Sequence, residues 1–427
     1  MAEFSVVGKR IPRVDAHEQV TGRLVYGDDM YRPNMLFAQA RYADHPHARI
    51  LGMDVSQAKN MSGVRAIVTY KDVPHNRYGF NIHDQRVLVD DKVRYRGDCI
   101  AVVAADTQEL ARSAADAIKV EYEVLQPLLS PVDAMREGAP LIHGDQFDTN
   151  VPVHLKLRLG DAEEGFAQCS VVHSETYSTQ KVDHAPMEPH VALAEIEPDG
   201  TLVITTSTSR VFHYVGILTM VLQMPMTKLR VKSAAVGGAF GGKNEVMLEP
   251  WVGLLALKTG RPVKMTYSRK EDLCTSTVRH AYVLKYKMGA AKDGRLLAAE
   301  IEIIADGGAY AGLSKSTLTK AMVHATGPYF IPNVKVDGYV AYTNALIASS
   351  MRGMGVPQVC FAVESHMDAM AQQLDMSPEA FRRINLFGEH GNLPNGQVVN
   401  TKALRLTFER ALTLYDGECE KEGDAGG

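Results

Sequence analysis

The chain has 427 residues, of which 45% are hydrophobic and 22% are charged, and its formal net charge is −4. This length is too great for one ordinary core and predicts two or three domains, while the composition is that of a soluble globular protein. The small negative charge argues against nucleic acid or an anionic membrane surface as a partner.

The cysteines are scattered along the chain and form no CxxC pair; they are Cys99, Cys169, Cys274, Cys360 and Cys419. This spacing argues against an iron–sulfur cluster or a structural zinc site, because both need closely placed thiolates. An odd, sparse set also indicates a reducing compartment. Since the first residues lack the apolar run of a signal peptide and no run of 18 apolar residues follows, we expect a cytoplasmic protein without a membrane segment.

Residues 1–145 alternate strand-like and helical segments. A buried strand is predicted at 100–104, followed by a helix at 108–117 with Thr107 as its N-terminal cap. Residues 120–124 alternate polar and apolar side chains, which is typical of a strand. The stretch 128–145 contains two prolines and two glycines and is predicted to be a linker between domains.

From about residue 150 the chain becomes rich in strands. The predicted elements are a β-hairpin (191–197 and 202–206), two strands (296–305 and 334–342) and two helices (246–259 and 358–374). His366 lies on the apolar face of the last helix and is predicted to be a core or interface residue. These elements predict an α+β domain over residues 146–416, whereas the polar tail 417–427 is expected to be disordered.

Residues 236–243 (VGGAFGGK) place four glycines around Phe240. Glycines permit positive φ, so such a loop can point several N–H groups at a ligand oxygen. The spacing fits neither a P-loop nor GxGxxG, and a tightly packed turn is the alternative.

Residues 349–358 (SSMRGMGVPQ) place Arg352 before a Gly-x-Gly turn at the entrance of the last predicted helix. An arginine there can bind an anion beside free helix N–H groups, and a surface arginine that caps a turn is the alternative.

Together the two loops resemble the molybdopterin-binding chain of the xanthine dehydrogenase and aldehyde oxidase family. The family's Gly-Gly-x-Phe-Gly-Gly-Lys loop matches residues 237–243, and its Arg-Gly-x-Gly-x-Pro-Gln loop matches 352–358. The similarity extends over nearly the whole chain, including Met187-Glu188-Pro189. It implies an α+β fold, in which an N-terminal α/β hammerhead domain (1–145) precedes the first molybdenum-cofactor-binding α+β domain (146–416).

The resemblance implies a molybdenum–pterin dinucleotide, expected in the cytosine form. The pterin dithiolene carries the metal, which has a terminal sulfur or selenium and no protein ligand. The cofactor-binding residues carried over from the family are Ser209, Gly237, Gly238, Ala239, Phe240, Gly241, Arg352, Gly353, Met354 and Gly355. Preorganised N–H donors of this kind suit a hydroxylation, because they point at the position where charge develops in the transition state.

Three positions depart from the family pattern. Ser209 stands where the family has a glutamine that bonds the metal's oxo group, so that bond is expected to be shortened, water-mediated or absent. Asn244 replaces a purine-binding glutamate, and Lys320 replaces a substrate-binding arginine, so purine is not the expected substrate. Phe240, Asn244 and Lys320 are the substrate candidates; Lys320 either attracts a carboxylate or is a solvated surface residue.

The sequence lacks a match to the family's second cofactor domain, which supplies a glutamate as general base. We therefore expect no complete set of catalytic residues in this chain. The resemblance implies a heteromultimer in which a second, medium molybdopterin subunit brings the base, while a 2Fe-2S subunit and an FAD subunit pass electrons to NADP.

Among split members, the chain resembles the enzymes that hydroxylate nicotinate to 6-hydroxynicotinate with oxygen from water. The small aromatic substrate is therefore expected to be nicotinate. The alternatives are another N-heterocycle, an aldehyde or an aromatic acyl-CoA as substrate, or a cofactor-less paralogue that serves as a scaffold.

Overall fold

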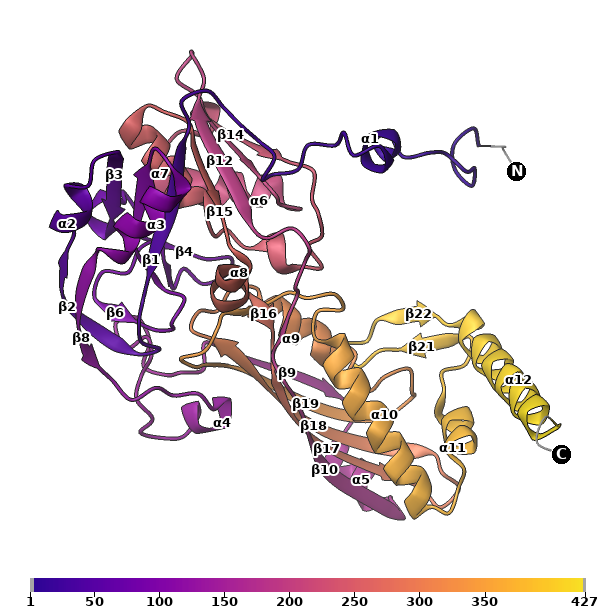
Figure 1. Cartoon of the computed structure of the whole chain (residues 1–427). Coiled ribbons are helices and arrows are strands. Elements are labelled where there is room, and N and C mark those ends of the chain that lie inside the picture. Colours follow the sequence, from indigo (N-terminus) through magenta and orange to yellow (C-terminus); the bar gives the residue numbers. More distant parts are fainter. Residues whose placement is uncertain (1–3, 425–427) are drawn as a thin grey trace.

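The computed structural model describes residues 4–424, with side chains up to residue 415. Its largest sheet has seven strands, with β1 (Leu36–Tyr42) near the centre (Figure 1). The spatial order is β14 (Leu229–Ser233), β13 (Leu202–Thr206), β12 (Val191–Ile196), β15 (Val263–Thr266), β1, β7 (Cys99–Ala105) and β3 (Val64–Thr69). Because β1 pairs in parallel with β15, this sheet joins segments on both sides of the boundary predicted at residue 145.

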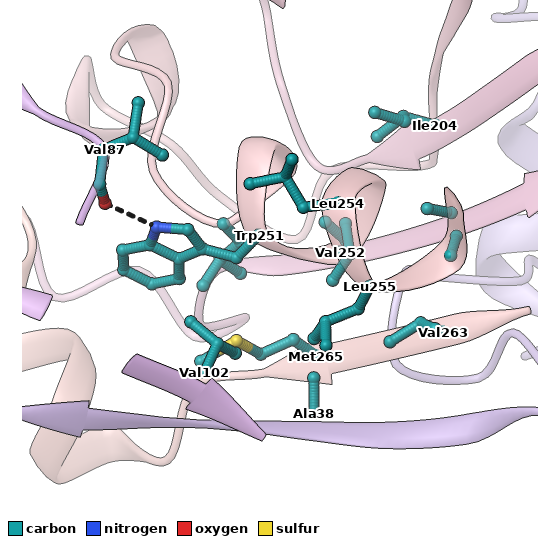
Figure 2. Close-up of a cluster of buried hydrophobic side chains, with 14 of the residues drawn as sticks. Ala38, Val87, Val102, Ile204, Trp251, Val252, Leu254, Leu255, Val263 and Met265 are labelled. Atoms are coloured by element: carbon teal, nitrogen blue, oxygen red, sulfur yellow. Dashed lines mark hydrogen bonds between the residues drawn. The ribbon is translucent and has the colours of Figure 1, made fainter. Parts of the chain in front are cut away.

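The core on this sheet is also shared. Helix α7 (Glu249–Thr259) packs on the sheet, and the buried Trp251 donates its indole N–H to the carbonyl oxygen of Val87 at 2.9 Å (Figure 2). Around the helix, Ala38 and Val102 from the N-terminal part lie with Val263 and Met265 from the later part (Figure 2). Apolar side chains from both parts of the chain are removed from water in the same cluster. Their burial therefore stabilises the two parts together.

The N-terminal part contains the predicted strand–helix–strand unit. Thr107 caps α3 (Gln108–Asp116) by accepting a hydrogen bond from the N–H of Leu110, as predicted. The other elements here are α1 (Ala16–Val20), α2 (Ser56–Lys59), the sheet β6-β2-β8 (Lys92–Val93, Ala48–Asp54, Lys119–Val124) and the pair β4–β5 (Arg77–Tyr78, Gln85–Arg86).

The segment 128–145 is packed against the body rather than exposed as a linker. It contains α4 (Pro131–Ala134), which Ser130 caps. Ile142 and His143 are buried, and the Nε2 atom of His143 lies 2.6 Å from the carbonyl oxygen of Ala309. The turn residues therefore shape a segment that contacts both parts of the chain.

The second large sheet has five strands and supports helix α10 (Val356–Gln373) on one face (Figure 1). The strand order is β10 (Val171–Thr179), β17 (Tyr282–Ala290), β18 (Leu296–Gly308), β19 (Asn333–Tyr342) and β9 (Val153–Leu159). The predicted hairpin (β12 and β13) and the strands at β18 and β19 are confirmed. His366 on α10 is buried, as predicted; its Nδ1 atom lies 3.1 Å from the Tyr177 hydroxyl, and burial lowers its pKa to about 4.

The remaining helices connect or flank these sheets. They are α5 (Ala162–Ala167), α6 (Val211–Leu222), α8 (Arg269–Thr275), α9 (Ser314–Val323) and α11 (Pro378–Asn385). Helix α7 begins at Glu249, three residues later than predicted, because Pro250 favours the first helical turn. Among the described residues, no helix combines the length and apolarity that crossing a membrane requires.

The C-terminal region differs from the prediction. A hairpin, β21 (His390–Asn392) and β22 (Val398–Asn400), precedes helix α12 (Lys402–Asp424). We predicted disorder from residue 417, whereas α12 extends through residues 417–424; residues 425–427 lie outside the described residues. The glutamates and lysine after residue 417 are good helix formers and continue a helix that has already formed.

Candidate functional site

A small three-stranded sheet brings three segments to one place. Its strands are β11 (Val182–Asp183), β16 (Val278–Arg279) and β20 (Ala348–Ser349). From β16, the guanidinium of Arg279 donates to the carbonyl oxygen of Arg352 at 2.8 Å and to the Oε1 atom of Gln358 at 3.3 Å. The arginine loop, residues 350–355, is therefore held between a strand and the start of α10.

The arginine loop lies directly against the glycine loop, residues 236–243. The backbone N–H of Arg352 donates to the carbonyl oxygen of Phe240 at 2.9 Å. Gly241 has φ +104°, and a Cβ atom there would lie 2.7 Å from the carbonyl oxygen of Ser350. Glycine is thus required at residue 241 by both the backbone conformation and the close approach.

Both loops contain a strained non-glycine residue. Phe240 has φ +50° and Met354 has φ +45°. Such conformations cost about 1–3 kcal/mol each and cluster at functional sites. Four other non-glycine residues of the described chain have positive φ (Asn34, Ala185, Gln223 and Asp375), so the two loops hold two of the six.

The glycine loop presents a row of backbone donors. Within the described residues, the N–H groups of Gly238, Ala239, Phe240 and Gly241 have no hydrogen-bond partner. Phe240 is 52% exposed, and the Arg352 side chain is also accessible to solvent. Three of these four residues (Gly238, Phe240 and Gly241) have positive φ. Consecutive donors on such a backbone, with an arginine beside them, fit the oxygen atoms of an anionic or oxo-bearing group.

Glu188 holds the glycine loop from behind. Its Oε2 atom accepts from the N–H of Gly237 at 2.8 Å and from the ammonium of Lys243 at 2.7 Å. Its Oε1 atom accepts from the N–H of Gly27 at 3.2 Å. Lys243 is fully buried, and burial lowers its pKa against the opposing effect of Glu188. The loop lysine therefore fixes the loop's shape rather than facing a ligand.

Ser209 and Asn244, two of the unusual positions, contact each other. The carbonyl oxygen of Gly241 can only accept, so Ser350 donates its hydroxyl proton to it at 3.2 Å. Ser350 in turn accepts from the amide of Asn244 at 2.9 Å, and the Asn244 carbonyl accepts from Ser209 at 2.8 Å. The hydroxyl proton of Ser209 is thus directed at Asn244. The Asn244 amide keeps one further N–H that can donate elsewhere.

Lys320 lies apart from this network. It is exposed on α9, the helix against which Gly355 packs, since a Cβ at Gly355 would lie 2.7 Å from the carbonyl oxygen of Thr317. In the described chain, its side chain makes no hydrogen bond or ion pair with the other predicted site residues. The roles of Ser350, Arg279 and Glu188 were not predicted; Glu188 lies inside the family's Met187-Glu188-Pro189 motif, which gives no sign of these contacts.

The described residues contain no group of three His, Cys, Asp or Glu side chains that could hold a metal ion directly. Cys99, Cys169, Cys274 and Cys360 are free thiols, and the side chain of Cys419 lies outside the described residues.

Comparison with known proteins places this geometry in a family. A molybdopterin cofactor-binding domain model matches residues 142–386, and an aldehyde oxidase and xanthine dehydrogenase a/b hammerhead domain model matches residues 21–126. The chain is 39% identical to the nicotinate dehydrogenase large molybdopterin subunit of Eubacterium barkeri, over 96% of each chain. It is 40% identical to a probable xanthine dehydrogenase chain of Bacillus subtilis, over 88% of this chain and 50% of that protein.

Among solved structures, the aldehyde oxidoreductase of Desulfovibrio gigas superposes with a TM-score of 0.90 at 32% identity, over 96% of this chain and 46% of that chain. The chain therefore matches nearly the full length of one relative but only about half of the others. The domain order and the α+β fold agree with the prediction. The chain belongs to the molybdopterin-binding chains of the xanthine dehydrogenase and aldehyde oxidase family of molybdenum hydroxylases.

Proposed function

We propose that this chain is the large molybdopterin-binding subunit of a split molybdenum hydroxylase. The observation that carries the proposal is the joined pair of loops, in which four backbone N–H groups without a partner among the described residues stand beside Arg352. The molybdenum–pterin dinucleotide supplies two-electron oxidation when it is bound. Residues 237–241 would then orient its oxygen atoms through backbone donors, and residues 352–355 would hold its position from the neighbouring loop.

We propose an N-heteroaromatic acid, with nicotinate first, as the substrate. The free N–H of Asn244 is a donor, so it suits a ring nitrogen or a carboxylate on the substrate. The exposed ring of Phe240 offers an apolar surface to an aromatic ring. Lys320 would attract the substrate carboxylate only at long range, because within the described residues its side chain makes no hydrogen bond or ion pair with the other predicted site residues.

The remaining parts of the enzyme would reside on partner chains. These are a second molybdopterin subunit with the general-base glutamate, a 2Fe-2S subunit and an FAD subunit that passes electrons to NADP. This arrangement is supported by the partial coverage of the longer relatives. The cytosine form of the dinucleotide and sulfur or selenium on the metal are part of the same proposal.

The test is to purify the native complex through this chain and to measure molybdenum and selenium by elemental mass spectrometry. We expect about one molybdenum per chain, the three partner subunits, and conversion of nicotinate to 6-hydroxynicotinate with ¹⁸O from labelled water. If the complex instead turned over a different N-heterocycle, an aldehyde or an aromatic acyl-CoA, that compound would replace nicotinate as the proposed substrate. A complex without molybdenum would overturn the proposal in favour of a scaffold.

A further inference from the structure

The N-terminal arm, residues 4–25, projects from the body of the protein (Figure 1). Its large apolar side chains are exposed to solvent. Of these residues, none is buried. The exposed apolar side chains are Phe4, Val6, Val7, Ile11, Val14, Val20 and Val25. The hydrogen bonds of the turn around α1 join arm residues to each other, as in Ala16 to Arg13 and Gln19 to Asp15. An extended segment with this much exposed apolar surface gains stability when another surface covers it.

The root of the arm is fixed to the glycine loop. Tyr26 forms a parallel bridge with Ala235, immediately before that loop. Gly27 donates its N–H to Glu188, whose other oxygen holds Gly237 and Lys243. The close approach of Gly27 to Val191 leaves no room for a side chain. The arm therefore starts beside the candidate site, and a chain that completes the site lies within its reach.

The charge of the arm differs from that of the rest of the chain. The arm carries Lys9, Arg10, Arg13 and Arg23 against Asp15 and Glu18, a formal charge of +2. The whole chain has −4, so the remainder has −4 − 2 = −6. The arm thus suits a partner surface that combines acidic side chains with an apolar groove.

We propose that residues 4–25 are a clasp that binds the second molybdopterin chain and keeps it against the glycine loop. This inference rests on the proposed function, because it takes its occupant from the split enzyme. Binding would hold the arm against the partner and would reinforce the contacts of Tyr26 with Ala235 and of Gly27 with Glu188. In the Figure 1 view, the arm and the β21–β22 hairpin with α12 both extend to the right of the body.

The experiment uses the full complex purified through this chain. The test variant is Val6→Glu/Val14→Glu/Val20→Glu, which places charge on three exposed positions of the arm. The matched control is Leu51→Glu/Val124→Glu, since these side chains are also exposed, at 60% each, but lie on the strands β2 and β8. We expect the arm variant to retain at least ten-fold less of the second molybdopterin chain, while the control retains it.

The outcomes separate the clasp from the proposed function. An arm variant that keeps the second molybdopterin chain and its molybdenum overturns the clasp and leaves the proposed function standing. An arm variant that keeps that chain but halves the mass of the complex in light scattering shows that the arm binds a second copy, and this also overturns the proposal. A wild-type complex without molybdenum or a second molybdopterin chain overturns both.

Discussion

The backbone N–H of Arg352 donates to the carbonyl oxygen of Phe240 at 2.9 Å. The two loops that identify the family therefore meet through main-chain atoms, while the side chains of both residues remain exposed. Because this bond does not depend on either side chain, the loop arrangement survives side-chain substitution. The chemical roles of Phe240 and Arg352 can consequently be tested apart from the fold.

We predict that Arg352→Ala lowers the kcat of the intact complex by about 10²–10³-fold, the usual effect of removing one preorganised donor. Arg352→Lys should recover only part of the activity, because lysine keeps the charge and loses the planar fork. Phe240→Ala should mainly raise KM, since it removes the ring surface. Subunit composition and thermal midpoint serve as controls and should stay unchanged. An unchanged kcat in Arg352→Ala or an unchanged KM in Phe240→Ala would contradict these roles.

Gly241 provides a second, purely steric test. Gly241→Ala puts a methyl group 2.7 Å from the carbonyl oxygen of Ser350 at φ +104°, so the two loops must separate. We expect molybdenum content to fall at least several-fold. Gly260→Ala is the matched control, because residue 260 also has positive φ (+65°) but has nothing within 4 Å of the added Cβ. Equal molybdenum loss in the two variants would show that backbone strain, rather than loop separation, is responsible.

The loops and the main helices could be predicted from the sequence because their signals are local. Glycine spacing marks residues 237–241, and Thr107 marks the start of α3. The seven-stranded sheet could not be predicted, since Leu36 pairs with Val263 and no local pattern fixes so distant a partner. The folding of 128–145 against the body was missed for a related reason. Its turn residues indicate where the chain bends, but they do not indicate what it then contacts.

The sequence singled out residues of the candidate site, but it did not predict the contacts between them. Ser209 and Asn244 were each noted as departures from the family, yet their hydrogen bond to one another spans 35 residues and depends on the tertiary fold. The same holds for Glu188, which links the arm, the glycine loop and Lys243. Because these two departures contact each other, the variants of Ser209 and Asn244 should be compared with one another.

Ser209 donates to Asn244, and the Asn244 amide donates to Ser350. The direction of these two hydrogen bonds gives a prediction about substrate binding. Asn244→Asp replaces the amide donor by a carboxylate, so it removes the N–H proposed for the substrate and repels a substrate carboxylate. We expect KM for nicotinate to rise about 10–100-fold, as for the loss of a hydrogen bond to a charged group. Ser209→Ala leaves that N–H in place and should change KM by less than about ten-fold. If Ser209→Ala raised KM more than Asn244→Asp, the assigned direction would be wrong.

Asp84 connects the N-terminal part to the later part and should make stability depend on pH. Its Oδ2 atom accepts from the Tyr342 hydroxyl at 2.6 Å and from the N–H of Ala311 at 2.7 Å, while Oδ1 has no partner in the described chain. Burial raises the pKa of Asp84 from 3.8 to about 6. The folded protein therefore binds this proton more tightly than the unfolded chain does. The stabilisation of the fold by protonated Asp84 is fully present below about pH 4 and is lost as the pH rises through 6.

We predict that Asp84→Asn removes this dependence and raises the free energy of unfolding, relative to wild type, by up to about 3 kcal/mol above pH 6. Asparagine keeps an acceptor for Tyr342 and Ala311, so the contacts between the two parts persist. Burial also raises the pKa of Asp98 to about 6. The stability of the Asp84→Asn variant should therefore still fall with rising pH, but less steeply than that of the wild type. The measurement is the thermal midpoint at pH 4.5 and pH 8, with Asp148→Asn as an exposed control. A variant whose midpoint follows the wild type at both pH values would show that Asp84 stays ionised in the folded protein.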